Sequence, residues 1–109
     1  MTKLSETLPI EEARERLRQL ISELAVVRGK VTLASGKEAD YYVDLRRITL
    51  HHEASRLVGQ VMLDLLDRNG IEFEAAGGLT MGADPVGSAL MRAAGDQDRA
   101  IEQFVVRKA

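Results

Sequence analysis

The chain has 109 residues, a length typical of one domain or of part of a larger one. Hydrophobic residues make up 45%, charged residues 29%, and the net charge is −2, which excludes a disordered chain and a basic surface for nucleic acid. Cysteine is absent, no apolar run reaches the ~20 residues of a membrane helix, and no signal peptide is recognisable, so we expect a cytoplasmic protein without disulfides or membrane contact.

An amphipathic helix is predicted over residues 9–28, because apolar residues recur there at steps of three and four. Gly29 would end this helix. The β-like runs 31–33 and 41–45 follow, and the turn Ser35-Gly36-Lys37 lies between them. This stretch predicts an antiparallel hairpin.

A second amphipathic helix is predicted over residues 51–68, with Asn69-Gly70 as its end. Two histidines, His51 and His52, lie at its start. No third metal ligand follows at a fitting spacing, so a capping or surface role is favoured over metal binding.

The remaining segments predict a strand–helix–strand unit. A strand at 73–78 runs into a loop at 80–83, a helix at 84–94 follows, and a last strand covers 101–106. Asp84 precedes a proline, which favours a role as helix N-cap over catalysis. The two strands should be parallel with a right-handed crossover. Parallel sheets normally have several strands and two covered faces, so we expect the front part of a larger α/β domain. Such a chain should be less stable than a whole domain, or rely on dimerisation to cover its sheet edge.

Two features at the carboxyl ends of these strands suit an anion. Glycines in Gly77-Gly78-Leu79-Thr80-Met81-Gly82 would let a ligand approach the backbone and the next helix N-terminus, although the spacing matches no dinucleotide or Walker motif. Arg107-Lys108 follows the last strand, at the edge where open α/β sheets bind ligands. A tight turn and a solvated terminus, respectively, remain the alternatives.

The hairpin segment offers a different chemistry. The side chains of Tyr41 and Tyr42 should point to opposite faces of a strand, so that one packs inward while the other stacks on a planar ring. Lys37, Arg46 and Arg47 add positive charge for a carboxylate or phosphate. An ordinary hairpin with solvated charges is the alternative.

Four stretches, in this order, resemble the orotate phosphoribosyltransferase family: TLASGKEADYYVDLRRITL (32–50), HHEASRLVGQVMLDLL (51–66), EAAGGLTMGADPVGSAL (74–90) and FVVRKA (104–109). The resemblance implies an α/β fold of the type I phosphoribosyltransferase kind, a Rossmann-like parallel sheet with an N-terminal helix and hairpin hood, here truncated. The hood would occupy residues 1–50 and the first part of the parallel core residues 51–109.

The resemblance also implies a reaction. Orotate displaces pyrophosphate from 5-phosphoribosyl 1-pyrophosphate (PRPP) to give orotidine 5′-monophosphate in pyrimidine (UMP) biosynthesis, with Mg²⁺ on the pyrophosphate and usually in a homodimer. Catalysis would depend on positioning and charge stabilisation, with no acid–base residue implied. The implied orotate contacts are Lys37, Tyr41 and Tyr42, beside Ser35 and Gly36; the implied pyrophosphate contacts are Thr80, Met81, Arg107 and Lys108, beside Gly82.

The chain also departs from the family pattern. Many members have a lysine where this chain has Ala34, and Tyr-Lys where it has Thr80-Met81. The family continues beyond the position of Ala109 with a catalytic loop and a ribose-phosphate motif, so we expect the 109-residue chain alone to be inactive. The alternatives are a non-catalytic module that binds orotate or a nucleotide, or only dimerises, and a purine enzyme of the same fold.

Overall fold

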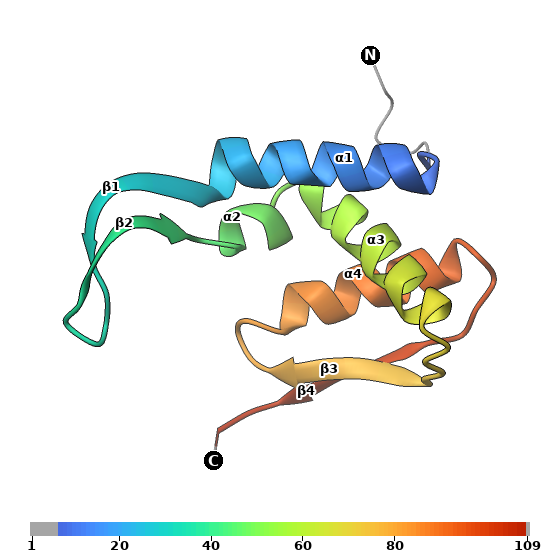
Figure 1. Ribbon diagram of the computed structural model, residues 1–109. Helices are drawn as coiled ribbons and strands as arrows, with labels where there is room; N and C mark the ends of the chain where they lie inside the picture. Colours follow the sequence, from blue (N-terminus) through green and yellow to red (C-terminus); the bar gives the residue numbers. More distant parts are fainter. Residues whose placement is uncertain (1–6, 109) are drawn as a thin grey trace.

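A computed structural model describes residues 7–108 as two small sheets and a layer of helices (Figure 1). Residues 1–6 and Ala109, at the ends of the predicted hood and core, lie outside the described residues. The elements are α1 (Ile10–Leu20), the π-helical turn η1 (Ile21–Ala25), β1 (Val26–Thr32), β2 (Glu38–Val43), α2 (Arg46–Thr49), α3 (Ala54–Arg68), β3 (Ala75–Leu79), α4 (Asp84–Gly95) and β4 (Glu102–Val106). Strands β1 and β2 are antiparallel, and β3 and β4 are parallel, as expected. Within residues 7–108, no helix is long and apolar enough to cross a membrane.

The first helix is shorter than its apolar pattern predicts. α1 ends at Leu20, a single π-helical turn follows, and the chain is extended from Val26 onward. The β-branched pair Val26 and Val27 favours a strand, and both residues pair with β2. Gly29 therefore does not end a helix. It lies inside β1 with φ +115°, where the register between the strands is irregular.

The short helix α2 was not anticipated, and Asp44 explains its position. The Asp44 side chain accepts a hydrogen bond from the backbone N–H of Arg46, at 3.2 Å, at the start of this turn. Such a local bond favours a turn over continued strand. Strand β2 therefore ends at Val43 rather than at Leu45.

The capping role predicted for the histidines is confirmed for His51. Its Nδ1 atom accepts hydrogen bonds from the backbone N–H groups of Glu53 and Ala54, at 3.2 and 3.1 Å. Glu53 is the N-cap residue of α3 and Ala54 is its first residue, so neither N–H group has a partner within the helix. The helix begins at Ala54, three residues after the start that the apolar pattern of residues 51–68 predicts.

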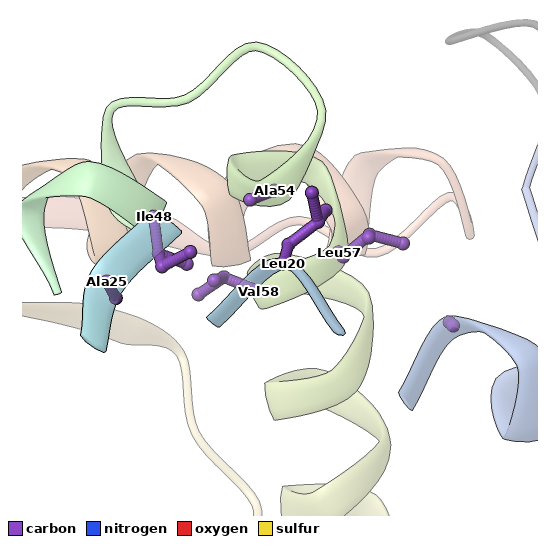
Figure 2. Close-up of a cluster of buried hydrophobic side chains, with 7 residues drawn as sticks. Leu20, Ala25, Ile48, Ala54, Leu57 and Val58 are labelled. Atoms are coloured by element: carbon purple, nitrogen blue, oxygen red, sulfur yellow. The ribbon is translucent and has the colours of Figure 1, made fainter. Parts of the chain in front are cut away.

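Helix α3 contributes to both hydrophobic clusters of the molecule. One cluster unites it with the N-terminal helices (Figure 2), and its buried residues are Ala13, Leu20, Ala25, Ile48, Ala54, Leu57 and Val58. The other cluster lies between α3, α4 and the start of β4, and its buried residues are Leu63, Leu90, Ala94 and Ile101. Because both clusters include α3, this helix connects the N-terminal layer to the parallel sheet.

The two helices α3 and α4 pack closely because residue 59 is glycine. A Cβ atom at Gly59 would lie 2.2 Å from the carbonyl oxygen of Ala89. Real Cβ atoms do not approach backbone oxygen so closely, so any side chain at Gly59 would force the helices apart.

Gly59→Ala should therefore lower stability, although alanine in a helix interior normally raises it. We expect a loss of about 1–3 kcal/mol in the free energy of unfolding, because the added methyl group overpacks the crossing. Urea unfolding followed by circular dichroism would measure it. Gly95→Ala is the matched control, because nothing lies within 4 Å of a Cβ there. A Gly59→Ala chain as stable as the Gly95→Ala chain would contradict the packing argument.

An ion pair connects α1 to the start of α3. The Nε and Nη2 atoms of Arg16 donate hydrogen bonds to the two carboxylate oxygens of Glu53, at 2.8 and 2.9 Å. This bond to Arg16 is the largest cause that holds the pKa of Glu53 below its ordinary value of 4.5. A depressed carboxyl pKa stabilises the fold above that ordinary value, and this contribution is lost as the pH falls through the folded-state pKa.

Glu53→Gln should thus destabilise the chain at neutral pH and have little effect in acid. We expect the free energy of unfolding to fall by about 0.5–1 kcal/mol at neutral pH, a small value because both partners are partly exposed to water. Urea titrations of both chains, at neutral pH and well below pH 4.5, would measure the difference. The exposed loop residue Glu72 provides the control, as Glu72→Gln. A difference that persists unchanged in acid would contradict the assignment.

Candidate functional site

The carboxyl edge of the parallel sheet brings together the residues predicted to face pyrophosphate. Strand β3 ends at Leu79, which pairs with Val106, the last residue of β4. The backbone N–H of Thr80 donates to the carbonyl of Val106 at 3.0 Å. The loop at 80–83 therefore begins directly beside the segment that carries Arg107 and Lys108, and both of these cations are exposed.

This loop presents open backbone amides. The N–H of Ala83 donates to the carbonyl of Leu79 at 3.0 Å, which closes the loop. Within residues 7–108, the amides of Met81 and Gly82 have no hydrogen-bond acceptor, and the Met81 side chain is 82% exposed. The Thr80–Met81 peptide bond is cis. Open amides before a helix N-terminus suit an anion.

The prediction that Asp84 caps α4 is wrong. Helix α4 begins at Asp84, Ala83 occupies the N-cap position, and no side chain caps the helix. A capping carboxylate at residue 84 would accept the N–H of Val86 or Gly87, but the N–H of Gly87 donates to the carbonyl of Ala83 at 2.9 Å and no side-chain capping bond forms. The Oδ2 atom of Asp84 accepts a hydrogen bond from the Thr80 hydroxyl, and Oδ1 is buried without a partner among the described residues.

The predicted orotate contacts lie on the other sheet. Lys37 lies in the β1–β2 turn, and its carbonyl accepts a hydrogen bond from the N–H of Leu33 at 2.8 Å. Tyr41 and Tyr42 are 59% and 42% exposed, so the expectation that one tyrosine packs inward is wrong. The hairpin has only two strands and projects from the helices (Figure 1), so neither of its faces forms a core.

The two arginines after the hairpin are already paired. The Nε atom of Arg46 lies 3.3 Å from Oδ1 of Asp44, and the Nε atom of Arg47 lies 3.7 Å from Oδ2. The hydrogen bond from Arg46 is the largest cause that lowers the pKa of Asp44. Because two arginines share one carboxylate, the cluster keeps a net positive charge, and the expectation that Arg46 and Arg47 add positive charge for a ligand stays a prediction.

A separate groove of about 550 Å³ runs between α3 and α4. Its lining includes Arg56, Gln60, Ser88 and Arg92, but none of the predicted substrate residues. Among residues 7–108, no three histidine or acidic side chains gather in a way that could hold a metal ion. The carboxyl edge is the better candidate, because open amides and two cations meet there.

No protein-family model matches the chain. It is 59% identical over 100 residues to the orotate phosphoribosyltransferase of Streptomyces avermitilis and 55% identical over 98 residues to that of Mycobacterium avium. The orotate phosphoribosyltransferase of Mycobacterium tuberculosis, solved with inorganic phosphate, superposes with a TM-score of 0.77 at 54% identity. In sequence and in fold, the chain matches the N-terminal half of the orotate phosphoribosyltransferases.

These alignments cover most of this chain but only half of its relatives. The alignment with the Streptomyces orotate phosphoribosyltransferase covers 92% of this chain and 54% of that protein. The alignment with the Mycobacterium tuberculosis structure covers 89% of this chain and 55% of that one. A second structure of that enzyme, solved with PRPP, superposes with a TM-score of 0.74 at 52% identity. The predicted resemblance and the predicted type I phosphoribosyltransferase fold are both confirmed.

Sequence reasoning missed one residue at this edge of the orotate phosphoribosyltransferase fold. Gln103 lies in β4 and bonds to the first turn of α4. The available signal was the uncharged amide side chain of Gln103 between Glu102 and the apolar residues that begin at Phe104. The hydrogen bond of Thr80 to Asp84 was also missed, although their spacing of four residues permits it.

Thr80→Val should destabilise this loop, because it replaces the hydroxyl with a methyl group and leaves the Asp84 carboxylate without its side-chain donor. We expect a loss of about 1.5–3 kcal/mol in the free energy of unfolding, the usual range for a hydrogen bond to a charged acceptor. Thr80→Ser keeps the hydroxyl and should retain most of the stability. Thermal and urea unfolding of the three chains would measure this. Equal stability of the valine and serine variants would show that the bond contributes nothing.

Proposed function

We propose that the protein is an orotate phosphoribosyltransferase, which transfers the phosphoribosyl group of PRPP to orotate and releases pyrophosphate. The observation that carries this proposal is the meeting of the open loop at 80–83 with Arg107 and Lys108 at one sheet edge. It occurs in a chain that is 59% identical to a relative of that name. The neighbour solved with PRPP supports the same substrate.

In this proposal, the carboxyl edge binds the pyrophosphate group. The amides of the Thr80–Met81–Gly82 loop would donate to its oxygens, and the cations of Arg107 and Lys108 would neutralise its charge. The reaction develops positive charge on the ribose ring and negative charge on the leaving group. Fixed donors and cations that face the leaving group would stabilise it without acid–base chemistry.

The hairpin would bind orotate. Lys37 is an exposed cation that suits the orotate carboxylate, and the exposed rings of Tyr41 and Tyr42 suit stacking on its planar ring. Lys37 has no ion pair in the described part of the chain, whereas Arg46 and Arg47 both pair with Asp44. Residues 1–50 would form a hood over a core that begins with residues 51–109.

Mg²⁺ would act on the pyrophosphate and neutralise part of its charge. The Asp84 carboxylate lies next to the loop, and its buried Oδ1 atom has no partner among the described residues, so it fits a role in holding Mg²⁺ or its bound water. Mg²⁺ is commonly held by one or two carboxylates, water and substrate phosphates. We further propose a cytoplasmic homodimer, as in the family that the sequence resembles.

A non-catalytic module that binds orotate or only dimerises is the other candidate from the sequence. The named relatives support the transferase instead. The two candidates differ in one measurable property, which is turnover of orotate in the presence of PRPP and Mg²⁺.

The proposal predicts that the whole protein isolated from its source cells forms orotidine 5′-monophosphate, and that the 109-residue chain alone does not. In the whole protein, Arg107→Ala with Lys108→Ala should lower kcat/KM for PRPP by about 100-fold or more, because each removes a charge-assisted contact. Steady-state rates from the loss of orotate absorbance would measure this.

The control removes the same charge elsewhere, as Arg14→Ala with Arg18→Ala on the exposed side of α1. It should leave the rate unchanged. Turnover by the 109-residue chain would show that the described residues suffice for catalysis, against our expectation. Full activity in the Arg107 and Lys108 variant would contradict the site, and no turnover by the whole protein would favour the binding module.

A further inference from the structure

Gln103 is a polar residue in β4 whose side chain faces α4. It is half-buried, whereas its neighbours Phe104 and Val105 are exposed. Its Nε2 atom donates to the backbone carbonyl of Asp84 at 2.8 Å, and its Oε1 atom accepts from the hydroxyl of Ser88 at 2.9 Å. Both ends of the amide are therefore used, which fixes its orientation.

The glycine at position 87 leaves room for this contact. A Cβ atom there would lie 3.0 Å from Nε2 and 3.2 Å from Cγ of Gln103. Because Gly87 has no side chain, the amide of Gln103 reaches the backbone of the first turn of α4. The strand and the helix thus fit each other at this point through one glutamine and one glycine.

The same turn holds the loop at 80–83. The carboxylate of Asp84 accepts the hydroxyl of Thr80, and the N–H of Thr80 donates to the carbonyl of Val106. Gln103 and Val106 belong to the same strand. Strand β4 therefore holds the loop at both ends, directly at Thr80 and through Asp84 on the helical side.

We propose that Gln103 is a positioning residue for the pyrophosphate loop. By fixing Asp84, it keeps the loop in the conformation that leaves the amides of Met81 and Gly82 open to an anion. This inference rests on the proposed function, in which the loop binds pyrophosphate. Gln103 itself touches no substrate in this scheme.

The test uses the 109-residue chain with Gln103→Met, which keeps the length of the side chain and removes both hydrogen bonds. Amide hydrogen exchange by NMR should become about tenfold faster or more at Thr80, Ala83 and Gly87, the effect of two lost hydrogen bonds on a local opening. Exchange at the buried Leu63 of α3 should not change. Gln97→Met is the control, because the side chain of Gln97 makes no hydrogen bond among the described residues.

A second variant keeps the test valid if the Gln103→Met chain does not fold. Ser88→Ala removes only the donor to Oε1, so it should accelerate exchange at the same three amides by a smaller factor. If either variant accelerates all amides equally, Gln103 serves overall stability and the proposal is wrong. Unchanged exchange at Thr80, Ala83 and Gly87 would overturn it as well.

Titration with inorganic pyrophosphate forms the second arm. If the wild-type chain binds pyrophosphate, Gln103→Met should raise the Kd by about fivefold or more, because local opening lowers the population of the conformation that binds. An unchanged Kd beside faster loop exchange would overturn the positioning role. If the wild-type chain binds no pyrophosphate, the proposed anion site fails in this chain, while the exchange pattern still decides whether Gln103 holds the loop.

Discussion

The close crossing of α3 and α4 at Gly59 is the constraint on which the other contacts depend. Helix α3 is the only described element with buried residues in both hydrophobic clusters, so α4 is placed relative to the N-terminal layer through this crossing. Helix α4 in turn covers β3 and β4 and begins at the candidate loop. A wider separation of the two helices would therefore move the loop as well as open the core.

Parallel pairing of β3 with β4 then decides where chemistry can occur. Two segments that are 27 residues apart in the sequence, Thr80 and Arg107, become neighbours because both strands end at the same edge. The crossover helix starts there too, so backbone amides and cations share one small region. The groove between α3 and α4 contains none of the residues predicted to bind pyrophosphate.

The sequence predicted the order and type of most elements, because the helical and strand periods are clear in helices α3 and α4 and in the hairpin. It misplaced features that depend on competition between neighbours. The first helix was predicted to continue to residue 28, but its last turn ends at Ala25, because Val26 pairs with Val43 in the hairpin. Asp84 was expected to cap α4, but the N–H it needed is bonded to Ala83. Composition could not show that Asp44 pairs with Arg46 and Arg47, since that depends on where α2 begins.

The distribution of charge supports a site in which binding does the chemical work. Some acidic and basic side chains pair with each other, as in Arg16 with Glu53 and Arg99 with Asp67, but Arg107 and Lys108, like Lys37, have no ion pair among the described residues. Beside them lie amides without acceptors rather than a general acid or base. A reaction whose leaving group is a polyanion needs cations and donors fixed before it arrives, because water would otherwise have to reorganise around the developing charge. The hydrogen bonds from Gln103 to Asp84 and from Thr80 to Asp84 fit this need. In the proposed enzyme, they would fix the loop amides when the chain folds, before the substrate binds.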